Sequence, residues 1–142
     1  MEQSEVRIHS VITNDQQELN HFLETLGDRL EESGVAFAVA TRIQVCLDEM
    51  LSNAVKYGYP PESTGQIEIS ITFDGAEILV TVSDDGIAFN PFDRESPDSL
   101  DKELEARDIG GLGIHIVKTM ARRYDYQRTK NHNVNRFWLT AQ

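Results

Sequence analysis

Apolar residues recur at spacings of three and four in three stretches of the chain, a pattern that predicts three amphipathic helices. The first is expected to begin at Asn14, with Gln17 as its capping-box partner, and to stop at Gly34. The second is expected to end at Gly58, before two prolines, and the third to follow the glycine-rich residues 110–113. The apolar positions are Leu19, Phe22 or Leu23, Leu26 and Leu30 in the first helix, Val39, Ile43, Cys46, Leu47, Met50, Ala54 and Val55 in the second, and Ile116, Val117 and Met120 in the third.

Alternation of apolar and polar residues predicts five strands, of which the first is expected at a sheet edge. They cover residues 5–12, 66–73, 76–82, 124–130 and 134–140. In the central pair the apolar residues fall on one face and the polar residues on the other. Helices are therefore expected to cover only one side of the sheet.

Two turns are predicted between neighbouring strands. Asp74 and Gly75 signal a two-residue hairpin loop, and such a loop would place Ile71 opposite Ile78. The last two strands are expected to turn at residues 131–133, which are rich in asparagine.

The inward row of the third strand continues from Val82 to Asp84, because side chains alternate with a period of two. A buried carboxylate without a partner costs several kcal/mol or shifts its pKa. Asp84 is therefore expected to have a donor partner, either an internal residue or an amine of a ligand. The ligand is the favoured interpretation, because a glycine and an irregular segment follow directly.

A polar stripe on the second predicted helix carries Glu49, Asn53 and Lys56, at positions i, i+4 and i+7. Glu49 could accept a proton, and the amide oxygen of Asn53 could bind a hard cation such as Mg²⁺. The alternative is that both are ordinary surface residues of a solvated helix face.

The chain loses periodicity between residues 85 and 108, and a loop of this length in a compact domain is usually a lid or disordered. The following segment, Gly110, Gly111, Leu112 and Gly113, runs directly into a helical pattern. A glycine-rich turn at a helix N-terminus offers free N–H groups to phosphate, although it is often only a tight turn.

Composition narrows the range of partners and compartments. The chain has 142 residues, enough for one domain with a real core, and a formal net charge of -11. Nucleic acid is therefore an unexpected partner, whereas a basic protein fits an acidic surface. The single cysteine, Cys46, lies on an apolar helix face and is expected to be a small buried hydrophobe. With no long apolar run and no signal-peptide pattern, the chain is expected to be cytoplasmic, without membrane contact.

Three segments now stand in a recognisable order: E-x-x-x-N on a helix, D-D-G-I-A-F-N-P after a strand, and G-G-L-G-I before a helix. Together they resemble the GHKL, or Bergerat-fold, ATP-binding superfamily, over residues 14–140. The chain length, the D-G-x-A-F-N-P form and the closing Tyr-x-Arg and Asn-x-Phe-x-Leu pattern resemble the anti-sigma-factor serine/threonine kinase branch. The resemblance implies an α/β (α+β) two-layer sandwich, with a mixed, mostly antiparallel sheet and helices on one face.

The resemblance also implies roles for individual residues. Glu49 matches the catalytic base, Asn53 the Mg²⁺ ligand, and Asp84 the acceptor for the adenine amino group. Residues 92–109 match a mobile ATP lid, from which Arg107 or Lys102 could touch phosphate. The implied nucleotide-binding residues are Asn53, Asp84, Gly86, Ala88, Arg107, Gly110, Gly111, Leu112 and Gly113.

Two positions depart from the family pattern. Ala88 stands where many relatives have a second glycine, which is tolerable if the backbone there is not at positive φ. Tyr57 stands where many anti-sigma kinases have a histidine, so phosphotransfer depends on whether that histidine assists catalysis.

The implied function is that of an anti-sigma factor that binds Mg-ATP and phosphorylates a serine or threonine of a STAS-type antagonist. Its partners would be a sigma factor, the antagonist and a second copy of the chain, since relatives dimerise. One alternative is a non-catalytic module that binds a partner in an ATP-dependent manner. Another is a slow ATPase working as a clamp, which is less favoured because the chain lacks the second domain of such clamps.

Overall fold

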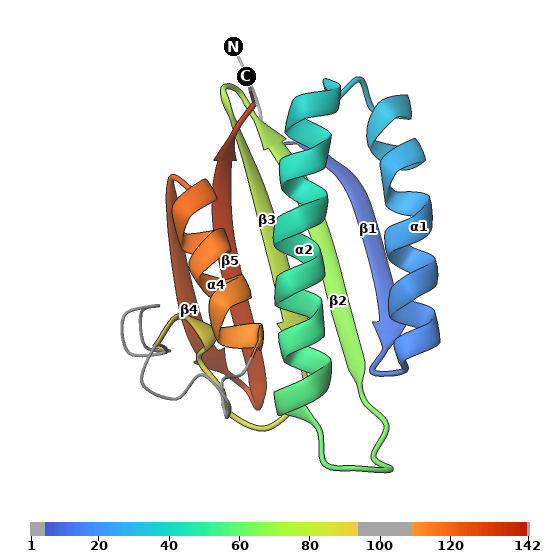
Figure 1. The fold of residues 1–142 in the computed structure, drawn as a ribbon, viewed down its shortest axis with the longest axis vertical. Coiled ribbons are helices and arrows are strands. Elements are labelled where there is room, and N and C mark those ends of the chain that lie inside the picture. The colour runs from blue at the N-terminus through green and yellow to red at the C-terminus, as the bar shows by residue number, and fades with distance from the viewer. Residues whose placement is uncertain (1–4, 94–108, 142) are drawn as a thin grey trace.

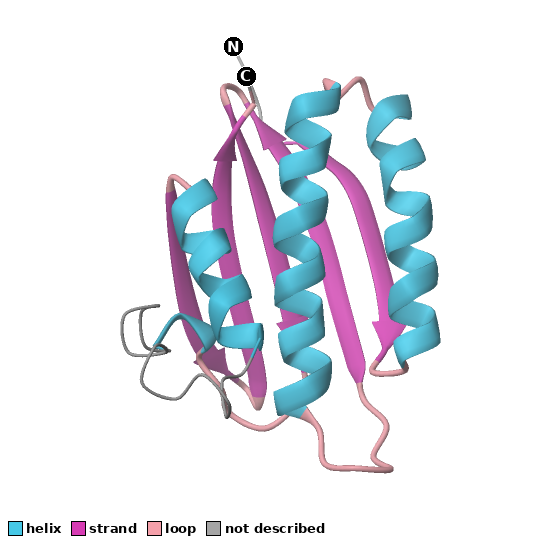
Figure 2. Cartoon of the chain, viewed as in Figure 1, coloured by secondary structure: helices cyan, strands magenta, loops and turns pink. Residues whose placement is uncertain are grey.

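The computed structural model describes residues 5–93 and 109–141. Five strands form one sheet in the order β1-β2-β3-β5-β4, and the helices cover one of its faces (Figures 1 and 2). In chain order the elements are β1 (Glu5–Thr13), α1 (Gln16–Glu32), α2 (Phe37–Gly58), β2 (Gln66–Asp74), β3 (Glu77–Asp84), the short 3₁₀ helix η1 (Pro91–Asp93), α4 (Ile109–Met120), β4 (Arg123–Thr129) and β5 (His132–Thr140). The predicted two-layer sandwich is confirmed, but the described sheet is antiparallel throughout rather than mixed, because every neighbouring pair of its strands is antiparallel.

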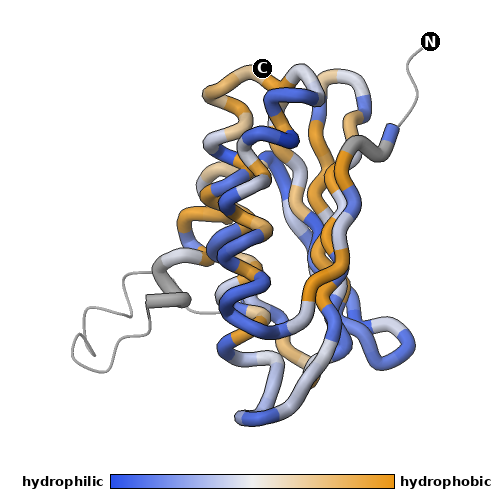
Figure 3. Tube along the Cα trace, turned by 90° about the vertical axis from the view of Figure 1, so that its right-hand side faces the viewer, coloured by the Kyte–Doolittle hydropathy of each residue, from blue (hydrophilic) through white to orange (hydrophobic). Residues whose placement is uncertain are grey.

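The core lies between the two layers and is built from the apolar stripes that the sequence predicts. Apolar and polar residues alternate along the helices and strands when the layers are seen side-on (Figure 3). Helix α2 lies between α1 and α4 over the middle of the sheet (Figure 1). The buried apolar residues include Leu19, Phe22, Leu26 and Leu30 of α1, Val39, Ile43, Cys46, Leu47, Met50 and Ala54 of α2, and Ile67, Ile69, Ile71, Ile78, Val80 and Val82 of the central hairpin.

The central hairpin has a different register from the predicted one. Asp74 pairs with Glu77, so the two loop residues are Gly75 and Ala76, and Ile71 lies opposite Val80. Gly75 has a φ of +64°, a conformation that glycine adopts easily, and this takes the turn one residue beyond Asp74. The pairing shifts by two residues, and therefore every apolar side chain keeps its predicted face.

The second hairpin turns earlier than predicted, whereas the central hairpin turns one residue later. Lys130 and Asn131 form its loop, with φ values of +51° and +66°, and His132 already belongs to β5. Two successive residues at positive φ match the right-handed twist of the flanking strands. The shift places Asn133 inside the strand, on the inward row, where its side chain is 2% exposed.

The start of α1 also differs from the prediction. Asp15 is the N-cap residue, without a side-chain cap hydrogen bond, and the side chain of Asn14 serves a different purpose. Its amide donates to the carbonyl of Ser63 at 2.9 Å, and its oxygen accepts from the N–H of Gly65 at 3.0 Å. Asn14 therefore ties the loop before β2 to the loop before α1.

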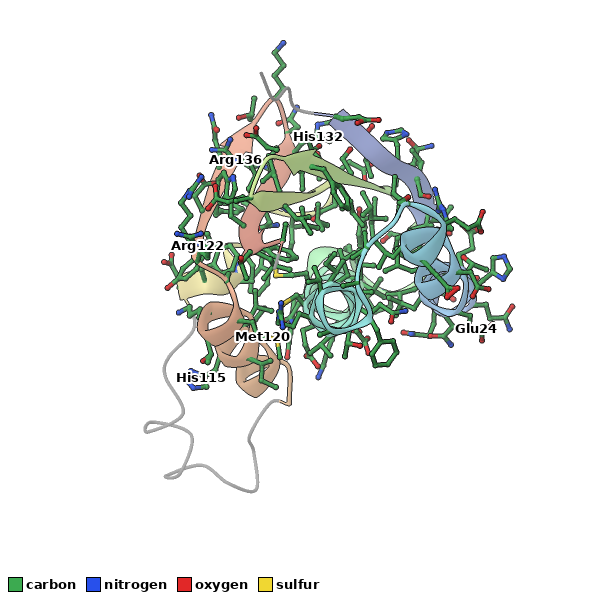
Figure 4. The ribbon with its side chains drawn as sticks, turned by 90° about the horizontal axis from the view of Figure 1, so that it is seen from above. Glu24, His115, Met120, Arg122, His132 and Arg136 are labelled. Carbon is green, nitrogen blue, oxygen red and sulfur yellow. The ribbon has the colours of Figure 1, made fainter. Side chains whose placement is uncertain are left out.

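None of the described helices covers the outer face of the sheet, and charged side chains such as that of Arg136 lie on it (Figure 4). On it, Trp138 lies between the guanidinium groups of Arg123 and Arg136, at 4.5 and 5.1 Å from the ring centroid. Arg123 forms two hydrogen bonds with the carboxylate of Glu77, and Arg136 forms two with that of Asp125. These ion pairs allow this face to stay in contact with water.

Cys46 is fully buried, with its sulfur 3.8 Å from that of Met120, and burial raises the pKa of its thiol to about 12. Met120 lies between α4 and α2 in Figure 4. The interpretation of Cys46 as a buried hydrophobe is confirmed. Of the helices in the described ranges, none has the length and apolar content needed to cross a bilayer.

Candidate functional site

The C-terminal end of α2, the end of β3, the beginning of α4 and the beginning of β5 meet at one end of the molecule (Figure 1). All of the sequence-predicted site residues that the structure describes come from these elements or from the loop after β3. Arg107 and Lys102, and most of the predicted lid, lie outside the described residues.

Asp84 ends β3 with its side chain turned inward, 3% exposed, which confirms the placement predicted from the strand period. Its Oδ1 accepts two hydrogen bonds of 2.9 Å, from the N–H of Gly86 and from Nδ2 of Asn133. The partner at this oxygen is therefore internal rather than a ligand. No residue in the described ranges donates to Oδ2.

The pKa of Asp84 is raised, mainly because burial disfavours the charged carboxylate. The hydrogen bonds from Asn133 and Gly86 act in the opposite direction and stabilise the ionised form. Asp84 therefore presents a second oxygen, to which none of the described residues donates, in a low-dielectric setting where a hydrogen bond to an amine would be strong.

Gly86 is required at its position for steric reasons. Its φ is not in the left-handed region, but a Cβ there would lie 2.4 Å from the carbonyl oxygen of Gly58 and 3.0 Å from Oδ1 of Asp84. The N–H of Ile87 donates to the same Gly58 carbonyl at 2.8 Å. The loop after β3 is thus held against the last residue of α2. Ala88 is exposed and not at positive φ, so alanine is tolerated there.

Asn133 was not predicted as a site residue, yet it organises this end of the molecule. Its Nδ2 donates to Asp84 and, at 2.7 Å, to the carbonyl of Ile87. Its Oδ1 accepts hydrogen bonds from three groups, which are the N–H of Phe89 at 3.1 Å, the hydroxyl of Tyr126 at 2.5 Å and the guanidinium of Arg128 at 3.2 Å. The sequence signal that could have indicated it is an asparagine on the inward row of a strand, which the shifted turn obscured.

Two residues further along the same row, Asn135 is 4% exposed, and its Oδ1 has no hydrogen-bond partner among the described residues. The N-x-F-x-L pattern contains this residue, but sequence reasoning gave it no role. A buried amide oxygen without a donor is rare in native proteins and is a candidate acceptor for water or a ligand.

Asn53 lies on the buried side of α2, 2% exposed, so the alternative of an ordinary solvated surface residue is wrong for it. Its Nδ2 donates to the carbonyl of Glu49 at 2.8 Å, while its Oδ1 has no hydrogen-bond partner among the described residues. An amide oxygen of this kind fits a hard cation such as Mg²⁺, which binds oxygen ligands. Within the described part of the chain, no three His, Cys, Asp or Glu side chains are grouped so that they could hold a metal ion by themselves.

Glu49, one turn before Asn53, is half-buried. The pKa of Glu49 is raised, first by burial and then by the neighbouring charge of Asp48. A carboxylate with a raised pKa has an increased affinity for a proton, as a general base requires.

The beginning of α4 packs very closely against this carboxylate. A Cβ on Gly113 would lie 1.7 Å from Oε2 of Glu49, so only glycine leaves space for the side chain. The glycine-rich segment was expected to precede its helix, but α4 already begins at Ile109. The first four N–H groups of a helix have no partner within it, and here they belong to residues 109–112.

Tyr57, at the position where the family resemblance leads one to expect histidine, packs its ring on Phe89 with centroids 5.4 Å apart. Lys56 lies with its ammonium 5.3 Å from the centroid of the same ring. The substituted residue therefore contributes to the contact between α2 and the loop after β3.

Comparison with known proteins agrees with this arrangement. The family model of the histidine kinase-like ATPase domain matches residues 12–139. The chain belongs to this family. The membership confirms the predicted superfamily and accounts for a helix layer on one face of an antiparallel sheet.

Proteins similar in sequence to this chain include named protein kinases. The serine-protein kinase RsbW of Listeria monocytogenes is 25% identical over 91 residues, which are 62% of this chain and 58% of that protein. The serine/threonine-protein kinase BtrW of Bordetella bronchiseptica is 26% identical over 91 residues, 64% of this chain and 63% of that protein. The matched part thus spans about three fifths of the length of these relatives.

A solved structure with the same fold is the histidine kinase AdeS of Acinetobacter baumannii. It superimposes with a TM-score of 0.50 and 14% sequence identity, covering 95% of this chain and 68% of that chain. At this level of identity the similarity concerns the fold alone.

Proposed function

We propose that the protein is an ATP-dependent serine/threonine protein kinase of the anti-sigma-factor type. The observation that carries the proposal is the buried Asp84, whose Oδ1 accepts two internal hydrogen bonds while Oδ2 receives none from the described residues. This oxygen would accept a hydrogen bond from the exocyclic amine of adenine. Family membership and the kinase names of the relatives support the same function.

The other end of the nucleotide would lie toward α2 and α4. The N–H groups at the beginning of α4 and the positive end of its dipole suit phosphate oxygens. Asn53 would hold Mg²⁺ through its Oδ1, which receives no hydrogen bond from the described residues, together with phosphate oxygens. Bound Mg²⁺ would supply neutralisation of the phosphate charge, the main requirement of phosphoryl transfer.

In the proposed reaction a serine or threonine hydroxyl oxygen of the substrate forms a bond to the γ-phosphorus. The bond between that phosphorus and the β,γ-bridging oxygen breaks, and ADP leaves. Glu49 accepts the hydroxyl proton, a role that suits its half-buried position and raised pKa.

The substrate would be a STAS-type antagonist, and the sequestered partner a sigma factor. The net charge of -11 suits a basic protein surface. The kinase would act as a cytoplasmic homodimer. Its candidate interaction surfaces are the edge strand β1, helix α1 and the outer face of the sheet.

Calorimetry with Mg-ATP tests the nucleotide assignment. Asp84→Asn places an amide N–H₂ or a neutral oxygen opposite the adenine amine, and ATP affinity should fall about 100-fold, the size of a lost hydrogen bond to a charged group. Asp85→Asn is the matched control, because it removes the same charge one residue later, on an exposed side chain. Equal affinities for Asp84→Asn and the wild type would refute the adenine assignment.

The antagonist can be captured by pull-down from native cell extract, with ATP and with ADP. Radiolabelled γ-phosphate should then move to a serine or threonine of the captured protein, and Glu49→Ala should abolish the transfer. Asp48→Ala, at the neighbouring exposed carboxylate, should retain it. ATP-dependent capture without transfer by the wild type would instead establish the non-catalytic binding module. The presence of Tyr57 in place of histidine is the specific observation that favours this second function.

A further inference from the structure

Both N–H groups of the Asn133 side-chain amide donate hydrogen bonds of 2.9 Å or less. Both acceptors lie far from Asn133 in the sequence. One bond fixes Oδ1 of Asp84 on the neighbouring strand, and the other fixes the carbonyl of Ile87 in the loop after β3. The backbone pairing is in register here, since Asp84 lies directly opposite Asn133. The amide therefore connects the carboxylate to the loop that follows it.

The oxygen of the same amide is held from the other side. Tyr126 and Arg128, both on β4, donate to Oδ1, and the N–H of Phe89 donates to it from the loop. Arg128 also donates to the carbonyl of Gly86 at 2.9 Å. With both ends bonded, the amide cannot exchange its oxygen and nitrogen without breaking several hydrogen bonds.

We propose that Asn133 is a positioning residue for the nucleotide base, which keeps the Asp84 carboxylate ionised and turned so that Oδ2 is the open acceptor. This inference rests on the proposed function, in which that oxygen receives the exocyclic amine. In addition, the ionisation and the orientation of the Asp84 carboxylate are attributed to a residue on a different strand. It also excludes a role for Asn133 as a mere space-filling residue of the sheet.

The electrostatic surroundings of Asp84 explain why such a residue is needed. Burial and the neighbouring Asp85 favour the protonated acid, whereas Asn133, the N–H of Gly86 and the Arg128 guanidinium favour the carboxylate. Tyr59, after α2, also faces this charge. A protonated Asp84 would carry a donor where the base presents a donor, so loss of the Asn133 amide would weaken binding of the amine.

Asn133→Leu tests the inference, because leucine has nearly the same size but donates no hydrogen bond. Carbon-detected NMR of the protein without nucleotide should show Asp84 titrating at a higher pH than in the wild type. Fluorescent ADP should bind about 10- to 100-fold more weakly at neutral pH, the size of one lost hydrogen bond to a charged group. The acid limb of the pH profile for ADP binding should shift to higher pH, which a purely structural role would not produce.

Arg128→Met provides a second variant, because Arg128 is exposed and its loss should leave the fold intact even if the leucine variant does not fold. It should change the Asp84 titration and the ADP affinity in the same direction, by a smaller amount. Arg123→Met is the charge-matched control, since Arg123 lies on the same strand but pairs with Glu77 on the outer face. It should leave the titration of Asp84 unchanged.

The outcomes separate this inference from the proposed function. An unchanged Asp84 titration in both test variants, with ADP binding intact in the wild type, overturns the role of Asn133 alone. A changed titration with unchanged ADP affinity overturns it as well, because the acceptor would then not contact the base. Failure of the wild type to bind ADP or ATP refutes the proposed function, and with it the nucleotide role of Asn133, whatever the titration shows.

Discussion

Two groups of residues at the same end of the molecule differ in how many of their hydrogen-bonding atoms have partners among the described residues. In the Asp84 cluster, formed by Asp84, Gly86 and Asn133, hydrogen bonds within the protein fix the carboxylate and the loop. In the Asn53 cluster, formed by Glu49, Asn53 and Gly113, a buried amide oxygen has no donor among the described residues, and a glycine leaves space for a carboxylate.

This contrast indicates which part of the site already has its hydrogen bonds formed before a ligand binds. A buried acceptor without a hydrogen-bond partner lowers the free energy of unfolding by about 1–3 kcal/mol. A contribution to stability therefore does not explain why Asn53 stands at this position. Under the proposed function, the Asp84 cluster would orient a base without further rearrangement, whereas the amide oxygen of Asn53, which has no donor in the described ranges, would gain a partner from a bound cation. Replacement of glycine by alanine should therefore reduce activity with little loss of stability in the Asn53 cluster, whereas it should reduce stability and nucleotide binding together in the Asp84 cluster.

Gly113→Ala should have the largest effect, a loss of phosphate transfer with little change in stability. The new Cβ would displace the end of the Glu49 side chain, which is flexible, so the free energy of unfolding should change by less than about 1 kcal/mol. Phosphate transfer should fall by about 10² to 10⁴, the contribution of a general base. Thermal unfolding and γ-phosphate transfer to the captured antagonist measure the two quantities.

Gly27→Ala is the matched control, because this helical glycine also lies against a flexible side chain, that of Gln44, but far from Glu49 in the sequence. It should leave transfer at the wild-type rate. A Gly113→Ala protein that transfers phosphate normally would show that Glu49 is not the base.

Gly86→Ala should act on stability and nucleotide binding together. Its Cβ would lie 2.4 Å from the backbone oxygen of Gly58, and backbone cannot move aside as a side chain can. The protein should lose about 1–3 kcal/mol of stability, the typical cost of overpacking, and its ATP affinity should fall below detection. Denaturant titration and calorimetry test this. A stability equal to that of Gly113→Ala would remove the contrast between the clusters.

Asn53→Leu should have a smaller effect on stability, with the opposite sign. Removing Oδ1, a buried oxygen with no donor in the described part of the protein, should raise the free energy of unfolding by about 1 kcal/mol in the absence of nucleotide. At the same time, the Mg²⁺ dependence of ATP binding should disappear, as measured by calorimetry with and without the metal. If this dependence persists, the metal ligand lies elsewhere in the protein.

The pH dependence of stability should show the smallest effect. Folding raises the pKa of Asp84 above its ordinary value of 3.8, so the folded state binds this proton more tightly than the unfolded state. The resulting stabilisation is present below about pH 3.8 and is lost as the pH rises through the raised pKa. Asp84→Asn should therefore increase the melting temperature at neutral pH, and the increase should shrink toward about pH 4. Asp85→Asn serves as the comparison, because folding lowers the pKa of Asp85 instead.

Much of the fold and part of the site could be predicted from local patterns. The spacing of apolar residues along α2 predicted its buried face, and the period of β3 predicted that Asp84 turns inward. The errors occurred at the loops, because turn position depends on which residues adopt positive φ, as at Gly75 and Lys130. Composition alone did not reveal this choice.

The order of amino acids specifies which residues are apolar, in what period they recur and in what order the three motifs stand, and these features suffice to predict the two layers and the family. Packing of distant elements placed Asn133 opposite Asp84, buried Asn53 with no donor to its oxygen among residues 5–93 and 109–141, and set Gly113 where it makes room for Glu49. The physical reason is that periodicity is a property of neighbouring residues in the chain. Hydrogen bonds and close approaches between distant elements depend instead on the register of strands and the packing of helices, which become fixed when the whole chain folds.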